Sequence, residues 1–200
     1  MSEKNFPKHL GLIIDGNRRF AKKLMLKPWQ GHELGAKKFR KVLTWCKDFD
    51  LKELTVYGLS TENLNRPKEE FDYLMKLFKE TFDKFADDPE INENGIKIKF
   101  IGNLHLLPEN IQESTKILEE KTKNNSEYLV NIALAYGGRD EIVNAAREIA
   151  KGVEEGTIKS SDVNKELFEK HLYTPDEPDM IIRTGGDQRS SNFMCYQSAY

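Results

Sequence analysis

The sequence contains little cysteine, with only Cys46 and Cys195 among its 200 residues. This number and spacing form neither a zinc-binding motif nor a C-x-x-C redox pair, so we expect two free buried thiols in a reducing compartment. No stretch approaches the roughly 18 apolar residues of a membrane-spanning helix. The N-terminus also lacks the apolar segment of a signal peptide. The sequence therefore predicts a cytoplasmic protein.

Motifs of several common enzyme classes are also missing. There is no G-x-G-x-x-G after a predicted strand and no G-x-x-x-x-G-K-[ST], which disfavours a dinucleotide enzyme and a P-loop NTPase. The four histidines, His9, His32, His105 and His171, are scattered, so neither a histidine metal cluster nor a Ser-His-Asp triad stands out. Basic and acidic residues nearly balance at 31 and 33, which argues against nucleic acid as a partner.

Apolar runs and helical periodicity alternate along the chain. The runs predict strands over 10–14, 54–59, 96–101, 128–136 and 180–182. The helical pattern predicts helices over 33–49, 69–86, 108–123, 141–152 and 162–171, with a turn-rich segment at 87–95. Such alternation is typical of an α/β fold, here one domain over residues 1–200 with a mostly parallel central sheet flanked by helices. The alternating strand 96–101 suits a sheet edge.

The most informative feature is Asp15, which follows the first predicted strand and opens the segment Asp15-Gly16-Asn17-Arg18-Arg19-Phe20-Ala21. Ligands of open α/β sheets bind at the carboxyl ends of the strands, and a helix start offers free N–H groups to an anion. A carboxylate beside arginines indicates a magnesium-bridged phosphate. A helix-capping Asp is the alternative.

Polar clusters follow three predicted strands, at 15–19, 60–66 and 183–192. Parallel strands bring these ends to one sheet edge, so the clusters are expected to share a cleft. Five arginines would then gather near Asp15, namely Arg18, Arg19, Arg66, Arg183 and Arg189. Two diphosphates and a magnesium ion would satisfy them, because guanidinium groups bind phosphate oxygens in a bidentate manner. A phosphatase with an aspartyl nucleophile is a rival, but the second Asp that it needs is replaced by Asn17.

The motifs, in their order and spacing, resemble those of the cis-prenyltransferase family, which includes undecaprenyl diphosphate and dehydrodolichyl diphosphate synthases. The likeness runs from about Pro7 to the end of the chain and rests on four stretches, namely 15–21, Gly31-His32, 60–67 with Glu70, and 183–192. Arg18-Arg19-Phe20 and the run 171–174 look more like archaeal and eukaryotic members than bacterial ones.

The resemblance implies a reaction and a cofactor. An allylic diphosphate, such as farnesyl diphosphate, would be extended by isopentenyl diphosphate with cis geometry to a long-chain polyprenyl diphosphate. Mg²⁺ would be the cofactor, held by Asp15, which would help the allylic diphosphate to leave. Asn63 would belong to the proton-removal step, and because an amide is a poor base we expect it to orient substrate or relay a proton.

The resemblance also implies substrate-binding residues. The allylic substrate would be contacted by Gly16, Asn17, Arg18, Arg19 and His32, with Phe20 beside the prenyl chain. The reacting end would be shaped by Ser60, Thr61, Glu62, Leu64 and Arg66. Isopentenyl diphosphate would be held by Arg183, Arg189, Ser190 and Ser191. The apolar stripe Leu74, Met75, Phe78, Phe82 and Phe85 would line an apolar tunnel or pack as core.

Two departures from the family pattern qualify these expectations. Pro28 stands where the family often has Arg, and Lys27 is a partial substitute. A downstream acidic residue and an Arg-x-Gly element that the resemblance implies do not occur before Tyr200, so we expect that the C-terminal portion is not included. A non-catalytic partner subunit is an alternative, although the retained Asp15, Asn17 and Asn63 favour catalysis. The resemblance further implies a homodimer or heterodimer, and peripheral contact with a membrane through the lipid product.

Overall fold

The computed structural model describes residues 6–27 and 29–199, except the side chain of Lys37. Pro28, the residue at the position where the family often has Arg, lies outside the described residues. Among the described helices, none combines the length and apolar character that crossing a bilayer requires.

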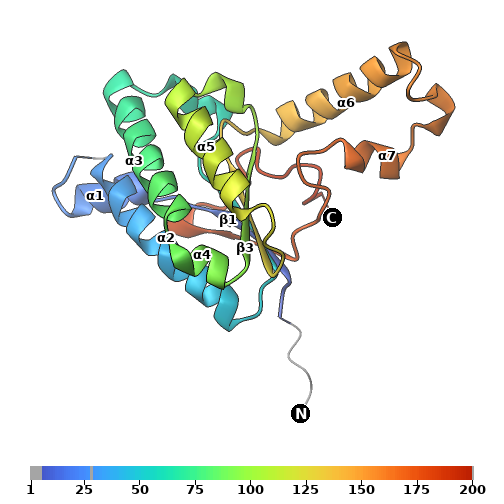
Figure 1. Cartoon of the computed structure of the whole chain (residues 1–200). Coiled ribbons are helices and arrows are strands. Elements are labelled where there is room, and N and C mark those ends of the chain that lie inside the picture. The colour runs from blue at the N-terminus through green and yellow to red at the C-terminus, as the bar shows by residue number, and fades with distance from the viewer. Residues whose placement is uncertain (1–5, 28, 200) are drawn as a thin grey trace.

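The centre of the molecule is a five-stranded sheet in the order β3-β4-β2-β1-β5 (Figure 1). All four strand pairings are parallel, which confirms the predicted α/β class. The strands are β1 (His9–Ile13), β2 (Glu53–Tyr57), β3 (Ile96–Ile101), β4 (Tyr128–Ala133) and β5 (Met180–Arg183). The predicted edge strand is indeed at an edge, as β3. The strand predicted over 128–136 ends earlier, because Ala135 adopts a positive φ of 45°.

The connections are mostly helical. The helices are α1 (Asn17–Lys23), α2 (Gln30–Asp48), α3 (Lys68–Ala86), α4 (Pro89–Glu93), α5 (Glu109–Thr122), α6 (Gly138–Glu154) and α7 (Lys165–Lys170). Short 3₁₀ turns occupy Thr61–Asn65, Leu104–Leu106, Ser160–Asp162 and Thr184–Gly186. The helix α4 lies in the segment predicted as turns. Its start has a recognisable signal, since the side chain of Asp88 caps Glu90 N and Pro89 occupies the first turn.

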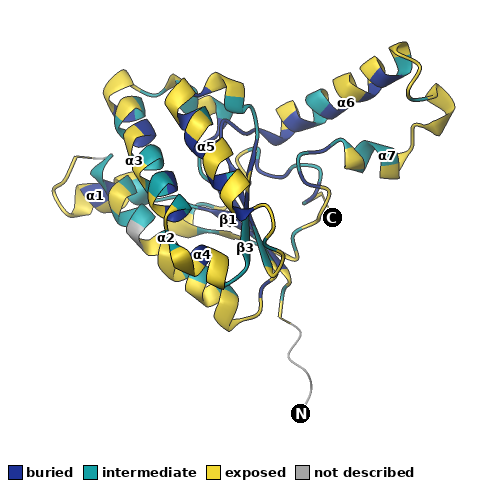
Figure 2. Cartoon of the chain, in the orientation of Figure 1, coloured by how far each residue is buried: buried dark blue, intermediate teal, exposed yellow. Residues whose placement is uncertain are grey.

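The two sheet faces bury different clusters, because successive side chains of a strand point to opposite sides. Leu12 and Val56 belong to the larger core, which also contains buried residues of α3 and α5. Ile13 and Tyr57 belong to a second cluster with Phe193 and Met194 of the C-terminal segment. Figure 2 shows exposed residues on the outer surfaces of α2, α3 and α5. The helix α6 extends away from the sheet (Figure 1). Phe193 and Met194, in the chain after β5, cover part of the face that carries Ile13 and Tyr57.

The parallel arrangement fixes where the polar clusters lie. β1 has β2 on one side and β5 on the other, and Ile13 is in register with both Tyr57 and Arg183. The segments that begin with Ile14, Gly58 and Thr184 therefore leave the sheet side by side at one edge.

Candidate active site

The loop after β1 holds Asp15 in a constrained position. Gly16 has a φ of 93°, a region that favours glycine, and its backbone N–H donates to Oδ1 of Asp15 at 2.6 Å. The hydroxyl oxygen Oγ1 of Thr184 accepts from Asp15 N at 2.9 Å and lies 2.6 Å from Asp15 O. The side chain of Thr184 in the loop after β5 thus holds the backbone of Asp15 in the loop after β1.

Two arginines contact the other carboxylate oxygen of Asp15. Arg183 donates from Nε and Nη2 to Oδ2 at 3.1 and 2.8 Å, and Arg19 donates from Nη2 at 3.3 Å. Partial burial raises the pKa of Asp15, but Arg183, the Gly16 N–H and Arg19 together outweigh it, so the pKa lies below its ordinary value. Asp15 is therefore ionised at neutral pH.

The same arginine orders the segment after β5. Nη1 of Arg183 donates to Oγ of Ser191 and to the carbonyl oxygen of Arg189, each at 2.7 Å. Ser191 and Asn192 both adopt positive φ values, 50° and 64°. Arg183 thus bridges Asp15 to a tight turn that carries further polar side chains.

The segment after β2 is a 3₁₀ turn that presents Asn63 and Arg66. Oγ of Ser60 accepts from Asn63 N at 3.3 Å, which caps the turn. Nε of Arg66 donates to Oδ1 of Asn63 at 3.1 Å. Because the carbonyl side of the amide is engaged by Arg66, the amide nitrogen, a donor, is the group left for a ligand.

A buried carboxylate organises the basic side of the site. Glu70 on α3 is 2% exposed, and its Oε1 accepts from Nη1 of Arg66 at 2.8 Å. Nε of Arg18 and Nε2 of His32 lie 3.6 Å from the same oxygen. Burial and the charge of Arg66 lower the pKa of His32, so its ring is neutral at pH 7.

Close packing of α2 against α1 sets the position of this group. A Cβ atom on Gly31 would lie 2.0 Å from the carbonyl oxygen of Asn17. Because any side chain would clash with this backbone oxygen, glycine is the residue that fits here. A Cβ on Gly35 would lie 2.7 Å from the side-chain nitrogen of Asn17. The Gly31-His32 motif therefore permits the contact that brings His32 beside the first loop.

A cavity of about 820 Å³ joins the strand ends to the space between α2 and α3. Its apolar lining includes Phe39, Leu74, Leu77, Phe78, Phe82 and Phe85. Its polar lining includes Asp15, Asn17, Arg18, His32, Ser60, Glu62, Asn63, Arg66, Arg183, Arg189, Ser190 and Ser191. The cavity thus suits a ligand with an anionic head and an apolar tail.

The apolar stripe of α3 is shared between the core and the wall of the cavity, and a tunnel for the prenyl chain stays a prediction. Leu74, Phe82 and Phe85 are buried in the core cluster and also line the cavity, as does the half-buried Phe78. Met75 is buried in the core and is not part of the lining.

Several predicted site residues do not line this cavity. Arg19 instead donates to Oδ2 of Asp187 at 2.9 Å and so ties α1 to the loop after β5. Gly16 supplies the backbone contact to Asp15, and Thr61 lies 3.2 Å from a carboxylate oxygen of Asp140. Phe20 is half exposed, so its expected place beside the prenyl chain stays a prediction. Leu64 packs against the core.

Two further residues line the cavity: Arg139, which sequence reasoning missed, and Asn192, which lay in the predicted cluster 183–192 but was given no role of its own. Arg139 follows Gly137-Gly138 after β4, so the strand-end signal that identified the other clusters would have found it. Asn192 accepts from Arg139 N at 2.9 Å and donates to Oε1 of Glu62 at 3.3 Å. Its contacts depend on how the C-terminal segment folds back, and no local pattern reports that.

The donor set around Asp15 fits a magnesium ion held mainly by a substrate. Within residues 6–27 and 29–199, no group of three or more His, Cys, Asp or Glu side chains could hold a metal. Mg²⁺, however, commonly uses one or two carboxylates and takes its other ligands from phosphate and water. Asp15 supplies one ionised carboxylate, and Gly16 is the sole hydrogen-bond donor to its Oδ1 among the described residues.

Comparison with known proteins identifies the family. Residues 13–200 match the family described as "Putative undecaprenyl diphosphate synthase". Two similar curated relatives, from Methanocaldococcus jannaschii and Thermococcus kodakarensis, are both named tritrans,polycis-undecaprenyl-diphosphate synthase (geranylgeranyl-diphosphate specific). The first is 47% identical over 204 residues, which cover 100% of this chain and 73% of the relative. The second is 47% identical over 198 residues, which cover 98% of this chain and 75% of the relative.

A solved structure agrees with these sequence relatives. Lavandulyl diphosphate synthase from Lavandula x intermedia, in complex with dimethylallyl diphosphate, matches with a TM-score of 0.88 and 34% identity, over 96% of this chain and 83% of that chain. The fold and the matches together define a transferase that acts on prenyl diphosphates. The chain belongs to the cis-prenyltransferase, or undecaprenyl diphosphate synthase, family, as the motifs predicted, and is a polyprenyl diphosphate synthase.

Proposed function

We propose that the chain condenses isopentenyl diphosphate repeatedly onto geranylgeranyl diphosphate, with cis geometry, to make undecaprenyl diphosphate. The observation that carries this proposal is the two-part cavity, in which the Asp15–Arg183 pair stands at the strand ends and aromatic residues of α3 line the remainder. A prenyl diphosphate has the matching chemistry, an anionic head on a chain that avoids water.

The primer diphosphate is assigned to the loop after β1 and the adjoining basic side chains. Asn17, Arg18 and His32 line that part of the cavity. Charge builds up on the diphosphate as its bond to the allylic carbon breaks. Fixed cations and N–H groups that are already oriented stabilise this charge more in the transition state than in the ground state. Asp15 would hold Mg²⁺, which when bound acts as a Lewis acid on the leaving diphosphate.

Isopentenyl diphosphate is assigned to the turn after β5, where Arg183, Arg189, Ser190 and Ser191 line the cavity. Asn63 orients this substrate by donating from its amide nitrogen, because its amide oxygen already accepts from Arg66. An uncharged amide does not take up a proton at neutral pH, so Asn63 acts by positioning the step in which the proton is lost.

The choice of primer departs from the sequence expectation, which used farnesyl diphosphate as its example. The names of both archaeal relatives specify geranylgeranyl diphosphate, and each relative shares 47% identity with this chain. Dimer formation, expected from the family resemblance, belongs to the same proposal and is tested by sedimentation velocity of the purified chain.

The test supplies labelled isopentenyl diphosphate and Mg²⁺ with either geranylgeranyl or farnesyl diphosphate, and compares rates and product lengths. We expect faster incorporation with geranylgeranyl diphosphate and products of undecaprenyl length. Faster incorporation with farnesyl diphosphate would overturn the primer assignment. Release of inorganic phosphate without chain growth would indicate a hydrolase. A purified chain that binds the prenyl diphosphates but incorporates no isopentenyl diphosphate would point to a non-catalytic partner subunit.

A further inference from the structure

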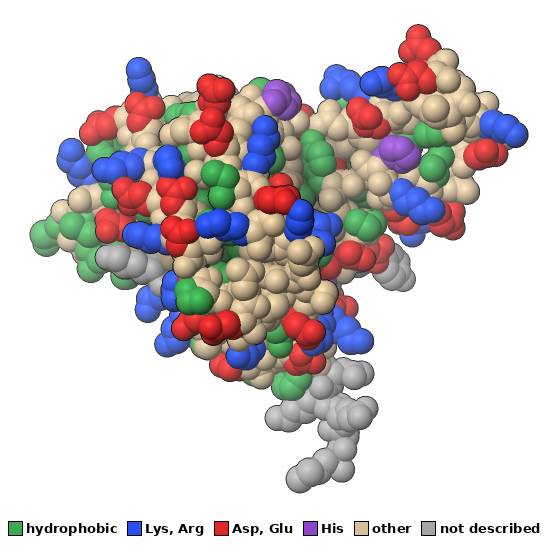
Figure 3. All heavy atoms as spheres, viewed as in Figure 1, with side chains coloured by type: hydrophobic (Ala, Val, Ile, Leu, Met, Phe, Trp, Pro, Cys, Tyr) green, Lys and Arg blue, Asp and Glu red, His purple; other side chains and the backbone are tan. Residues whose placement is uncertain are grey.

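The end of α1 carries apolar side chains that are partly or almost fully exposed to water. Met25 is 96% exposed, and Phe20, Leu24 and Leu26 are between 39% and 52% exposed. These residues, with Lys22, Lys23 and Lys27, are called the α1 tip. In Figure 3 hydrophobic side chains gather at the left edge of the molecule, where Figure 1 places the segment after α1.

The α1 tip is held in shape by its own backbone. Met25 N donates to Lys22 O at 3.1 Å and Leu26 N donates to Ala21 O at 3.0 Å. Met25 has a φ of 58°, which turns the chain sharply at the tip. Ala21, at the base, is fully buried. The apolar side chains are therefore presented to water by an ordered turn on an anchored helix.

The charge around these apolar residues is of one sign. Residues 16–32 contain the basic residues Arg18, Arg19, Lys22, Lys23 and Lys27, and no Asp or Glu. Arg18 and Arg19 pair with carboxylates of the site, and Lys27 lies 3.7 Å from Glu69. Lys22 and Lys23 are exposed and form no ion pair with a described residue. The α1 tip thus combines apolar groups with uncompensated positive charge.

We propose that the α1 tip docks on a membrane surface that carries anionic lipid headgroups. Exposed apolar groups rimmed by lysines match the boundary between headgroups and acyl chains, where the apolar side chains leave water and the ammonium groups meet phosphates. The charge complementarity favours a lipid surface over a second copy of the chain, which would bring the same positive charge to the contact.

Docking there would also place the cavity near the lipid phase. Arg18 lines the cavity and stands on the same helix as Lys22 and Lys23. The seven residues of α1 span about 10 Å, so the polar end of the cavity would lie close to the membrane surface. This consequence rests on the proposed function, whereas the docking itself does not.

The test is flotation of the full chain with vesicles in the absence of any substrate, so that its result is independent of catalysis. Vesicles of phosphatidylcholine with about one-third phosphatidylglycerol are compared with phosphatidylcholine alone. Two variants probe the tip, Met25→Ser for the apolar term and Lys22→Glu with Lys23→Glu for the charge. The matched control is Lys116→Glu with Ile117→Ser, an exposed basic and apolar pair on α5.

We expect the unmodified chain and the control to float with the anionic vesicles and to bind phosphatidylcholine weakly. The double lysine variant is expected to lose about tenfold or more in partitioning at low salt, with a smaller difference at high salt because ions screen the attraction. Met25→Ser is expected to lose binding at both salt concentrations.

Three results would overturn the proposal. One is an unmodified chain that does not float with anionic vesicles. Another is equal binding by the tip variants and the control. The third is a lowered oligomeric mass of Met25→Ser in sedimentation velocity with vesicle binding unchanged, which would assign the α1 tip to contact between copies.

Discussion

Arg183 donates two hydrogen bonds, of 3.1 and 2.8 Å, to a single carboxylate oxygen of Asp15, although 168 positions separate the two residues in the chain. The register of the sheet creates this contact, because Arg183 ends β5 directly opposite Ile13 of β1. Asp15 follows two residues later on the same side of the sheet edge. The meeting of carboxylate and guanidinium is therefore a consequence of parallel pairing.

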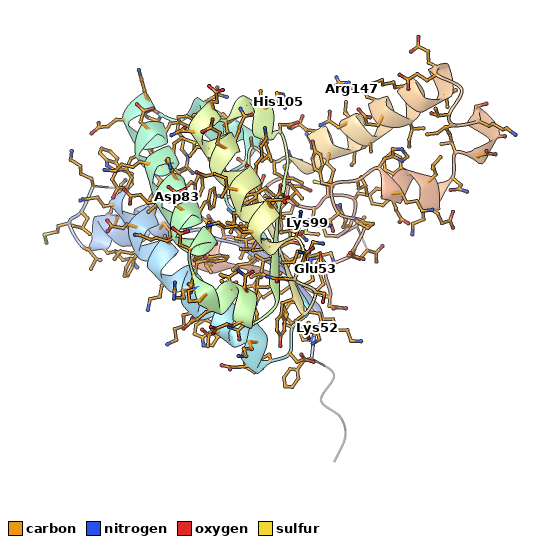
Figure 4. All side chains as sticks on the ribbon, viewed as in Figure 1. Lys52, Glu53, Asp83, Lys99, His105 and Arg147 are labelled. Atoms are coloured by element: carbon orange, nitrogen blue, oxygen red, sulfur yellow. The ribbon has the colours of Figure 1, made fainter. Side chains whose placement is uncertain are left out.

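Replacing Arg183 by Lys tests the planar fork. A lysine keeps the charge, but its single ammonium cannot bridge Asp15 Oδ2, Ser191 Oγ and Arg189 O as the guanidinium does. We expect kcat/KM for isopentenyl diphosphate to fall about 100-fold, with the far-UV circular dichroism spectrum unchanged. The matched control is Arg147→Lys on α6, labelled in Figure 4. Nη1 of Arg147 donates to Oδ1 of Asn144 at 3.4 Å, and Arg147 is not part of the cavity lining. Equal kinetics for the two variants would contradict the bridging role.

Much of this arrangement was predictable from local patterns. The strand Ile96–Ile101 was predicted with its observed bounds, and its edge position followed from its alternating lysines. The clusters at the ends of β1, β2 and β5 were predicted to converge because parallel topology requires it. These features depend on periodicity and on strand direction, both of which a sequence records.

The contacts within the site were not predictable in the same way. The pairing of Glu70 with Arg66, Arg18 and His32 joins α3, α1, α2 and the 3₁₀ turn, and depends on how closely those helices approach. Arg19, whose contact with the allylic diphosphate stays a prediction, donates within the chain to Asp187 and to the carbonyl oxygen of Gly185. Tertiary packing decides which carboxylate each basic side chain contacts, and a local sequence pattern does not report these pairings.

Glu70 is expected to stabilise the fold as well as the site. Glu70→Gln removes the charge that compensates a largely buried Arg66, and leaving a buried charge unpaired costs about 3 kcal/mol. The free energy of unfolding, measured in urea, should fall by about that amount. Glu69→Gln is the neighbouring control, because Glu69 is largely exposed and its pair with Lys27 is long, so its effect should stay within about 0.5 kcal/mol. Similar losses for both variants would refute the burial argument.

The glycines of α2 give a graded steric prediction. Gly31→Ala would place Cβ 2.0 Å from a backbone oxygen, whereas Gly35→Ala would meet the movable side chain of Asn17 at 2.7 Å. We expect Gly31→Ala to destabilise the chain by about 2 kcal/mol or more. Gly35→Ala should lose less stability but raise the KM for the primer, because Asn17 must shift. Urea unfolding and initial rates measure the two effects, and a larger stability loss at Gly35 would contradict the geometry.

A pH dependence is expected from Glu53 at the start of β2, labelled in Figure 4. Its Oε1 accepts from Asn131 at 2.6 Å, and burial with the nearby charge of Asp176 raises the pKa of Glu53 to about 7. Between pH 4.5 and about 7 the folded chain keeps a proton that the unfolded chain has released. The contribution of Glu53 to stability therefore declines as pH rises through this window.

Glu53→Gln removes that decline, since an amide stays neutral. Relative to the unmodified chain, the variant should gain about 2 kcal/mol in unfolding free energy between pH 5 and pH 8. The control is Glu148→Gln on α6, which removes an exposed carboxyl group and leaves Glu53 in place. A difference for Glu53→Gln that stays constant from pH 5 to pH 8 would mean that the pKa of Glu53 is not raised by burial.

The most direct test of the account is the turnover of Asp15→Asn, a change that keeps the size of the side chain and removes its charge. With labelled isopentenyl diphosphate, the preferred primer and Mg²⁺, we expect kcat to fall at least about 100-fold, while the circular dichroism spectrum and the urea midpoint show a folded chain. Normal turnover by a folded Asp15→Asn protein would contradict the claim that one carboxylate and the arginines around it form the reaction centre.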